Sequence, residues 1–175
     1  EKAEIMLTEN LGTDLSRIAN ELDKLLITKQ SNEFHITPEM IEKNIGISKD
    51  FNVFELQSAL INRDVLKANR IIRYFGENKK ANPIQMVVSQ LFSFFSNLMM
   101  YHYLPDKSST TVAAELKISA YFAKDYVQAA KTFNAWKTMN IISWIRETDS
   151  RSKGIEDTGT EHVDLLKELI YKILH

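Results

Sequence analysis

Apolar residues recur at helical spacing along most of this 175-residue chain, and no stretch shows the apolar–polar alternation of a half-buried strand. Ala68, Ile71, Ile72 and Phe75, for example, follow the i, i+3, i+4, i+7 pattern that places side chains on one face of a helix. Only five glycines and three prolines interrupt the sequence, which favours long regular elements with few turns. The pattern predicts an all-α fold.

The most apolar segment, residues 83–104, predicts a central helix. It has about the length needed to cross a bilayer, but glutamine, serine and asparagine residues interrupt it. We therefore interpret it as the core helix of a bundle, with Leu91 and Phe95 buried, and not as a membrane span. Its apolar stripe consists of Ile84, Val87, Val88, Leu91, Phe95 and Leu98.

Local signals predict several helix ends. Thr37 precedes a proline, and a hydroxyl cap followed by proline is typical of a helix start. Asp64 is the predicted N-cap of another helix, and Gly76 is predicted to end that helix in a left-handed conformation. Residues 149–154 are predicted to form a polar loop before the final helix.

The order of these segments predicts two domains. Three helical segments, two of them near residues 3–10 and 14–29, fill residues 1–46 and predict a small three-helix domain. The polar segment 45–50 is the expected linker to a larger helical bundle over residues 47–175. Gly46 is the residue of this segment at which regular structure is most readily broken. The apolar stripe of the second helix consists of Leu15, Ile18, Leu22 and Leu25.

Composition excludes several kinds of site. With 22 basic and 23 acidic residues the chain has no excess of positive charge for holding nucleic acid. It has no cysteine, which excludes disulfides and thiolate metal sites and fits a reducing cytoplasm. A glycine-rich phosphate loop is also absent, so we expect no ATP binding and no cofactor. Without cysteine, and with no serine in the strained turn of a nucleophile elbow, we expect no catalytic residues. The four histidines, His35, His102, His162 and His175, have no ligand spacing, so no metal site is expected.

Five segments follow one another in an order that resembles a known protein family. They are residues 12–25, 51–61, 67–72, 121–130 and 149–154. In this order and spacing they resemble the lid helices and C-terminal collar of the delta subunit of bacterial DNA polymerase III, a clamp-loader subunit. The resemblance covers nearly the whole chain, with one departure at Ala120, where the family often has proline.

The resemblance implies a function and a set of partners. Residues 1–46 would be the lid of an AAA+-like subunit, and residues 47–175 the collar that holds clamp-loader subunits together. Such a subunit is not itself catalytic, and its partners are the ATPase subunits and delta-prime. The family binds the sliding clamp through an N-terminal domain that we expect to be absent from this sequence, and it meets DNA only indirectly. The expected location is the replisome on the nucleoid, in the cytoplasm, without a membrane.

Two other functions remain open at this point. Residues 109–133 also have the pattern of a helix-turn-helix, in which Lys124, Gln128 and Lys131 would reach DNA. This alternative predicts a DNA-binding regulator. The third possibility is a helical adaptor unrelated to replication.

Aromatic residues are the remaining candidates for a functional surface. Most lie at helical spacing among leucine and isoleucine residues, which predicts burial in the core. Tyr103 and Trp136 lie at predicted helix edges, so they are the candidate anchors of a partner interface.

Overall fold

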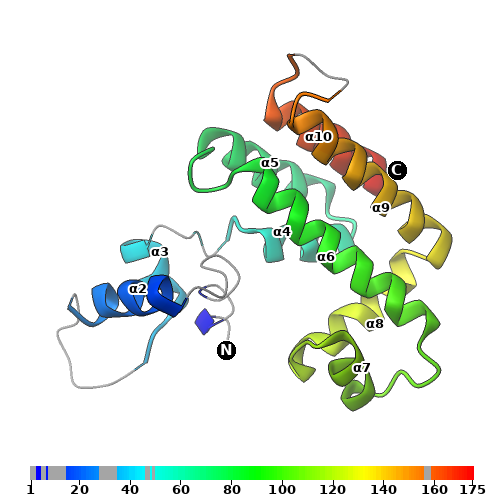
Figure 1. Ribbon diagram of the computed structural model, residues 1–175, viewed down its shortest axis with the longest axis horizontal. Helices are drawn as coiled ribbons and strands as arrows, with labels where there is room; N and C mark the ends of the chain where they lie inside the picture. The colour runs from blue at the N-terminus through cyan, green and yellow to red at the C-terminus, as the bar shows by residue number, and fades with distance from the viewer. Residues whose placement is uncertain are drawn as a thin grey trace. The chain divides into compact units, whose positions relative to one another are not determined.

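The computed structural model describes residues 3–4, 7, 15–27, 35–45, 48, 50–155 and 159–175. These residues form α-helices joined by turns and one short 3-10 helix, and none of them is in a strand (Figure 1). The chain divides into two compact units, Glu1–Asn52 and Val53–His175. The all-α fold predicted from the sequence is confirmed.

The first unit contains α2 (Leu15–Ile27) and α3 (Pro38–Ile45). Leu25 and Ile41 are buried in its apolar cluster. Leu15 was expected in the same stripe, but it is the first residue of α2 and is 79% exposed. The predicted turn at residues 12–14 and the glycine at 46 lie outside the described residues, as does most of segment 3–10. The cluster also includes Ala3 and Leu7, with Ile18, Leu22, Ile36, Met40 and Ile45 packed against it.

Helix α3 begins as the sequence predicts. The Thr37 hydroxyl accepts a hydrogen bond from the backbone N–H of Met40 at 3.3 Å, and Pro38 occupies the first helical position. This cap satisfies one of the backbone donors that a helix start leaves unpaired.

Buried Ser48, which follows α3, forms hydrogen bonds with residues on both sides of it in the sequence. Its hydroxyl donates to the Glu42 carboxylate at 3.2 Å and accepts from the backbone N–H of Phe51 at 3.1 Å. The Asn52 side-chain amide donates to the Ser48 carbonyl oxygen at 2.9 Å. The predicted linker therefore contains one residue that is held firmly within the first unit.

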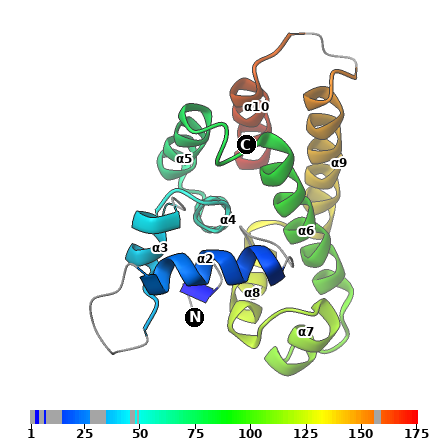
Figure 2. The ribbon, with the colours of Figure 1, turned by 60° about the vertical axis from the view of Figure 1, so that its left-hand side comes forward.

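The second unit is a helical bundle around α6. In this bundle α6 packs along α9, α10 packs against both α5 and α9, and α8 contacts α4 and α6 (Figures 1 and 2). Its helices are α4 (Val53–Ile61), α5 (Val65–Glu77), α6 (Ile84–Tyr103), α7 (Ser109–Leu116), α8 (Ala123–Thr132), α9 (Ala135–Ser152) and α10 (His162–Leu174), with the 3-10 helix η1 (Ala120–Phe122) before α8.

Helix α6 is the core element that its apolar stripe predicts. Leu91 and Phe95 are completely buried, and the Phe95 ring meets the Phe133 ring edge to face, with centroids 5.5 Å apart. The helix is not buried on all sides, since Phe92, Met100 and Tyr103 are exposed. Among the described residues no helix combines the length and the apolar character needed to span a bilayer.

Two glycines have roles other than those the sequence predicted. Gly76 is not a C-cap, because α5 continues to Glu77 and the cap is Asn78. A Cβ atom at position 76 would lie only 2.7 Å from Val163 Cγ2, so this glycine permits close contact between α5 and α10.

The left-handed glycine is Gly154, with φ of 82°. It follows the last turn of α9, which continues to Ser152 through a segment expected to be a loop. The Gly154 and Ile155 N–H groups donate to the Arg151 and Ser150 carbonyl oxygens, the paired bonds of a Schellman motif. The sequence prediction failed here because Asp149 and Lys153 form an i,i+4 ion pair that suits a helix surface.

Candidate interaction surface

Three large aromatic side chains of the described part of the second unit are largely exposed: Tyr103, Trp136 and Tyr171. Tyr103 is 77% exposed and Trp136 is 69% exposed. Tyr101 and Tyr126 are instead buried, and Trp144 is half-buried, with the Lys137 ammonium 4.8 Å from its ring centroid. Tyr103 and Trp136 therefore have the exposure that a partner contact requires.

Both residues lie at one end of the α6–α9 pair. Tyr103 is the last residue of α6, and Trp136 is in the first turn of α9. His102 Nε2 lies 2.9 Å from the Phe133 carbonyl oxygen, which joins the end of α6 to the start of α9. Because a carbonyl oxygen can only accept, Nε2 carries the proton in this hydrogen bond.

Helix periodicity places Tyr103 and Trp136 on the side of the α6–α9 pair that also carries a groove, between the start of α6 and the end of α9. An α-helix repeats its direction every 3.6 residues, so residues 18 apart project the same way. Gln85 and Tyr103 have this spacing on α6, and Trp136 and Ser143 are 7 apart, close to two turns, on α9. The stripe on α6 contains Gln85, Ser89, Phe92, Ser96 and Tyr103, and the stripe on α9 contains Trp136, Met139, Ser143, Arg146 and Ser150.

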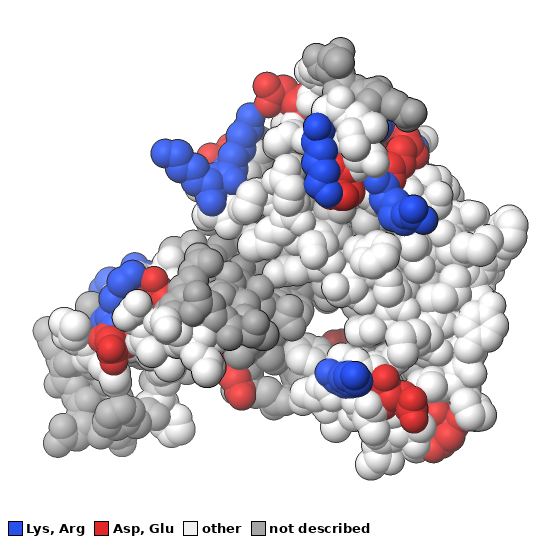
Figure 3. All heavy atoms as spheres, viewed as in Figure 1, with Lys and Arg blue, Asp and Glu red and all other residues white. Residues whose placement is uncertain are grey.

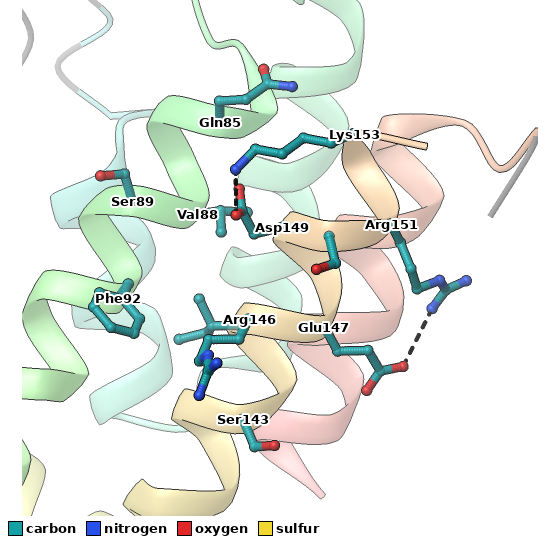
Figure 4. Close-up of a pocket in the computed structure, with 12 residues that line it drawn as sticks. Gln85, Val88, Ser89, Phe92, Ser143, Arg146, Glu147, Asp149, Arg151 and Lys153 are labelled. Atoms are coloured by element: carbon teal, nitrogen blue, oxygen red, sulfur yellow. Dashed lines mark hydrogen bonds and ion pairs between the residues drawn. The ribbon is translucent and has the colours of Figure 1, made fainter. Parts of the chain in front are cut away.

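The groove lies between the start of α6 and the end of α9 and has a volume of about 910 Å³ (Figure 4). Its α6 side is formed by Gln85, Val88, Ser89 and Phe92. Its α9 side is formed by Ser143, Ile145, Arg146, Glu147, Asp149, Ser150, Arg151 and Lys153. Periodicity alone did not reveal this groove, because it depends on the pairing of helices that are far apart in the sequence.

The charges around the groove are mostly paired. Lys153 binds the Asp149 carboxylate, and Arg151 donates to Glu168 on α10 at 2.8 Å. Hydrogen bonds from Lys172 and Arg151 hold the pKa of the Glu168 carboxyl below its ordinary value. Arg146 differs, since none of the described residues forms a hydrogen bond or ion pair with it.

The predicted helix-turn-helix is present as two helices packed into the bundle. Helices α7 and α8 are joined through Lys117, which has a left-handed φ of 53°, and through η1. The Phe122 ring stacks on the Phe54 ring of α4, with centroids 6.2 Å apart. The Tyr126 ring contacts the Phe94 ring of α6, with centroids 5.2 Å apart. These contacts hold one side of the pair against the core.

The other side of α8 carries the three residues that would contact DNA. Lys124, Gln128 and Lys131 are all exposed. Asp125 lies beside them, and burial raises the pKa of its carboxyl. In the face shown in Figure 3, basic and acidic side chains are interspersed and form no continuous basic stripe.

The described residues contain no cluster of three or more histidine, aspartate or glutamate side chains that could hold a metal ion. The four histidines are not gathered at one place: His35 lies before α3, His102 is in α6, and His162 and His175 lie at opposite ends of α10.

Comparison with known families decides how this bundle is classified. The sequence profile of the DNA polymerase III delta subunit, C-terminal domain, matches residues 50–170. The chain belongs to this family. The matched residues span most of the second unit, including the α6–α9 pair and the α7–α8 pair.

A solved structure of the Bacillus subtilis DNA clamp loader delta protein (YqeN) has a similar fold. The two share 22% sequence identity with a TM-score of 0.64, and the match covers 99% of this chain and 50% of that chain. This chain therefore spans about half the length of that protein. A comparison with curated proteins finds no match. The resemblance to the delta-subunit family seen in the sequence is confirmed.

Proposed function

We propose that this chain is the lid and collar part of a clamp-loader delta subunit, and that it assembles with other clamp-loader subunits during DNA replication. The observation that supports this most strongly is the family match over residues 50–170, which coincides with a separately packed helical unit. The first unit would be the lid and the second the collar.

In this proposal the chain acts as a rigid platform and has no catalytic residues of its own. The ATPase subunits supply the energy, and delta-prime is a further partner in the same ring. The sliding clamp and DNA are reached through other parts of the assembly, including the N-terminal domain of the full subunit. The assembly works in the cytoplasm, at the replisome.

Tyr103 and Trp136 are the proposed anchors of the collar on a neighbouring subunit. Large aromatic side chains contribute strongly to protein interfaces, because they bury much area with few rotatable bonds. The packed α6–α9 pair holds the backbones of both residues in place, so binding would cost little conformational entropy of the backbone.

Co-purification tests the proposal. The tagged chain is mixed with the clamp-loader ATPase and delta-prime subunits of its own cell, and in parallel is titrated with duplex DNA at physiological salt. We expect association with the subunits and only weak, salt-sensitive DNA binding. Tight sequence-specific DNA binding without subunit association would instead support the DNA-binding regulator built on residues 109–133.

A further inference from the structure

We infer that the α6–α9 groove binds a short peptide segment of a partner protein that presents a carboxylate beside an apolar side chain, with Arg146 binding the carboxylate. This site is distinct from the aromatic anchors, because it lies at the other end of the helix pair, where the start of α6 meets the end of α9.

The electrostatics of Arg146 favour a carboxylate as its ligand. Its side chain extends over the groove between Phe92 and Ser143 (Figure 4). Within the described part of the chain it has no anionic partner, although its neighbours Lys153 and Arg151 both have one. A guanidinium presents a planar set of donors that matches a carboxylate, and such charge-assisted pairs are stronger than neutral hydrogen bonds.

Polar side chains along the groove favour a peptide segment. The side chains of Gln85, Ser89 and Ser143 line it and form no hydrogen bond with the described residues. They can donate to and accept from the backbone of an extended segment. Phe92, which is 40% exposed, gives an apolar contact at one end of the α6 side of the groove. The volume of about 910 Å³ falls within the range of ligand-binding clefts.

The charges of the groove favour a peptide carboxylate over nucleic acid. A phosphate backbone carries closely spaced negative charges and is bound by several cations together. Among the described residues that line the groove, Arg146 is the one cation without an ion pair, and the carboxylates of Glu147 and Asp149 lie on the same helix, α9. These carboxylates would repel a run of phosphates, whereas a single carboxylate can bind Arg146 at a distance from them.

The test begins with selection from a phage-displayed library of random heptapeptides on the full immobilised chain. We expect the selected peptides to be enriched in aspartate or glutamate next to a leucine or an aromatic residue. The affinity of the best synthetic peptide should fall about tenfold or more in Arg146→Gln, which corresponds to loss of a charge-assisted hydrogen bond. Phe92→Ala should also lower the affinity for this peptide. Arg70→Gln is the control, because Arg70 is an exposed arginine on α5 that likewise forms no ion pair with the described residues.

Other results would overturn the inference. They are selected peptides without acidic residues, equal affinity for wild type and Arg146→Gln, and a single-stranded dT oligonucleotide whose binding depends on Arg146. Co-purification of Arg146→Gln with the clamp-loader subunits is measured separately. A loss of peptide binding in the groove is then distinguished from a loss of assembly with the subunits.

Discussion

Gly76 of α5 lies directly against Val163 of α10: an added Cβ atom would come within 2.7 Å of Val163 Cγ2. Real Cβ atoms do not approach a methyl group this closely, so the two helices pack here because position 76 has no side chain. Lys79 and Glu161 form an ion pair at 2.7 Å near the same ends of these elements. The contact fixes the last helix of the bundle onto α5.

Gly76→Ala should therefore destabilise the protein, although alanine is the better helix former. Overpacking costs about 1–3 kcal/mol, and the gain in helix propensity of about 1 kcal/mol offsets only part of it. Urea unfolding followed by circular dichroism measures the change. Gly159→Ala is the matched control, since nothing lies within 4 Å of its added Cβ atom. A Gly76→Ala/Val163→Ala double variant should recover part of the loss, and no recovery would contradict this account of the contact.

Leu91→Ala should lower the free energy of unfolding by about 2–5 kcal/mol. Leu91 is completely buried in α6, so the substitution leaves a cavity that the surrounding helices fill only in part. Leu66→Ala is the control, because Leu66 is exposed on α5. The same unfolding experiment should show a change for this control of about 0.5 kcal/mol or less. A loss below about 1 kcal/mol for Leu91→Ala would show that α6 does not form the core.

Lys117→Gly should stabilise the protein by about 0.5–1 kcal/mol. Lys117 has a left-handed φ of 53°, a conformation that costs a residue with a Cβ atom about 1–2 kcal/mol and costs glycine almost nothing. The greater freedom of glycine in the unfolded chain removes part of the gain. Lys124→Gly, within α8, should have the opposite effect and lower the free energy of unfolding by about 1 kcal/mol. Equal destabilisation by both substitutions in thermal unfolding would contradict the left-handed assignment.

The ion pairs of Glu168 should make stability depend on pH. Hydrogen bonds from Lys172 and Arg151, both at 2.8 Å, lower the pKa of this carboxyl in the folded protein. A lowered folded-state pKa contributes stability above the unfolded value of about 4.3, and this contribution is lost as the pH falls through the folded-state pKa.

Glu168→Gln should consequently cost about 0.2–1 kcal/mol at pH 7, the usual range for pairs this exposed. The difference from wild type should shrink in urea titrations below about pH 4. Glu115→Gln, an exposed glutamate on α7, controls for the change in net charge. A difference between wild type and Glu168→Gln that stays constant down to pH 2 would contradict an ionic origin.

The elements with local signals were predictable from the sequence. The stripe through Leu91 and Phe95 identifies the core helix, and the cap at Asp64 is confirmed by its hydrogen bond from the Lys67 N–H at 2.9 Å. Both features depend on residues within a few helical turns. The exposure of Tyr103 and Trp136 followed similarly from their positions at helix ends.

Features that depend on contacts between distant segments were not predictable in this way. Gly76 has the sequence context of a C-cap, and only its contact with Val163 in α10 reveals its actual role. Arg146 has the pattern of an ordinary surface residue on an amphipathic helix. It lies in a groove only because the start of α6 packs beside the end of α9.

Native mass spectrometry of the chain mixed with its clamp-loader ATPase and delta-prime subunits tests the proposed function most directly. The account predicts a mixed complex that contains this chain, and a weaker complex for Tyr103→Ala/Trp136→Ala. Tyr171→Ala, an exposed aromatic on α10, should assemble like wild type. Failure of the wild-type chain to enter any complex with these subunits would contradict the account.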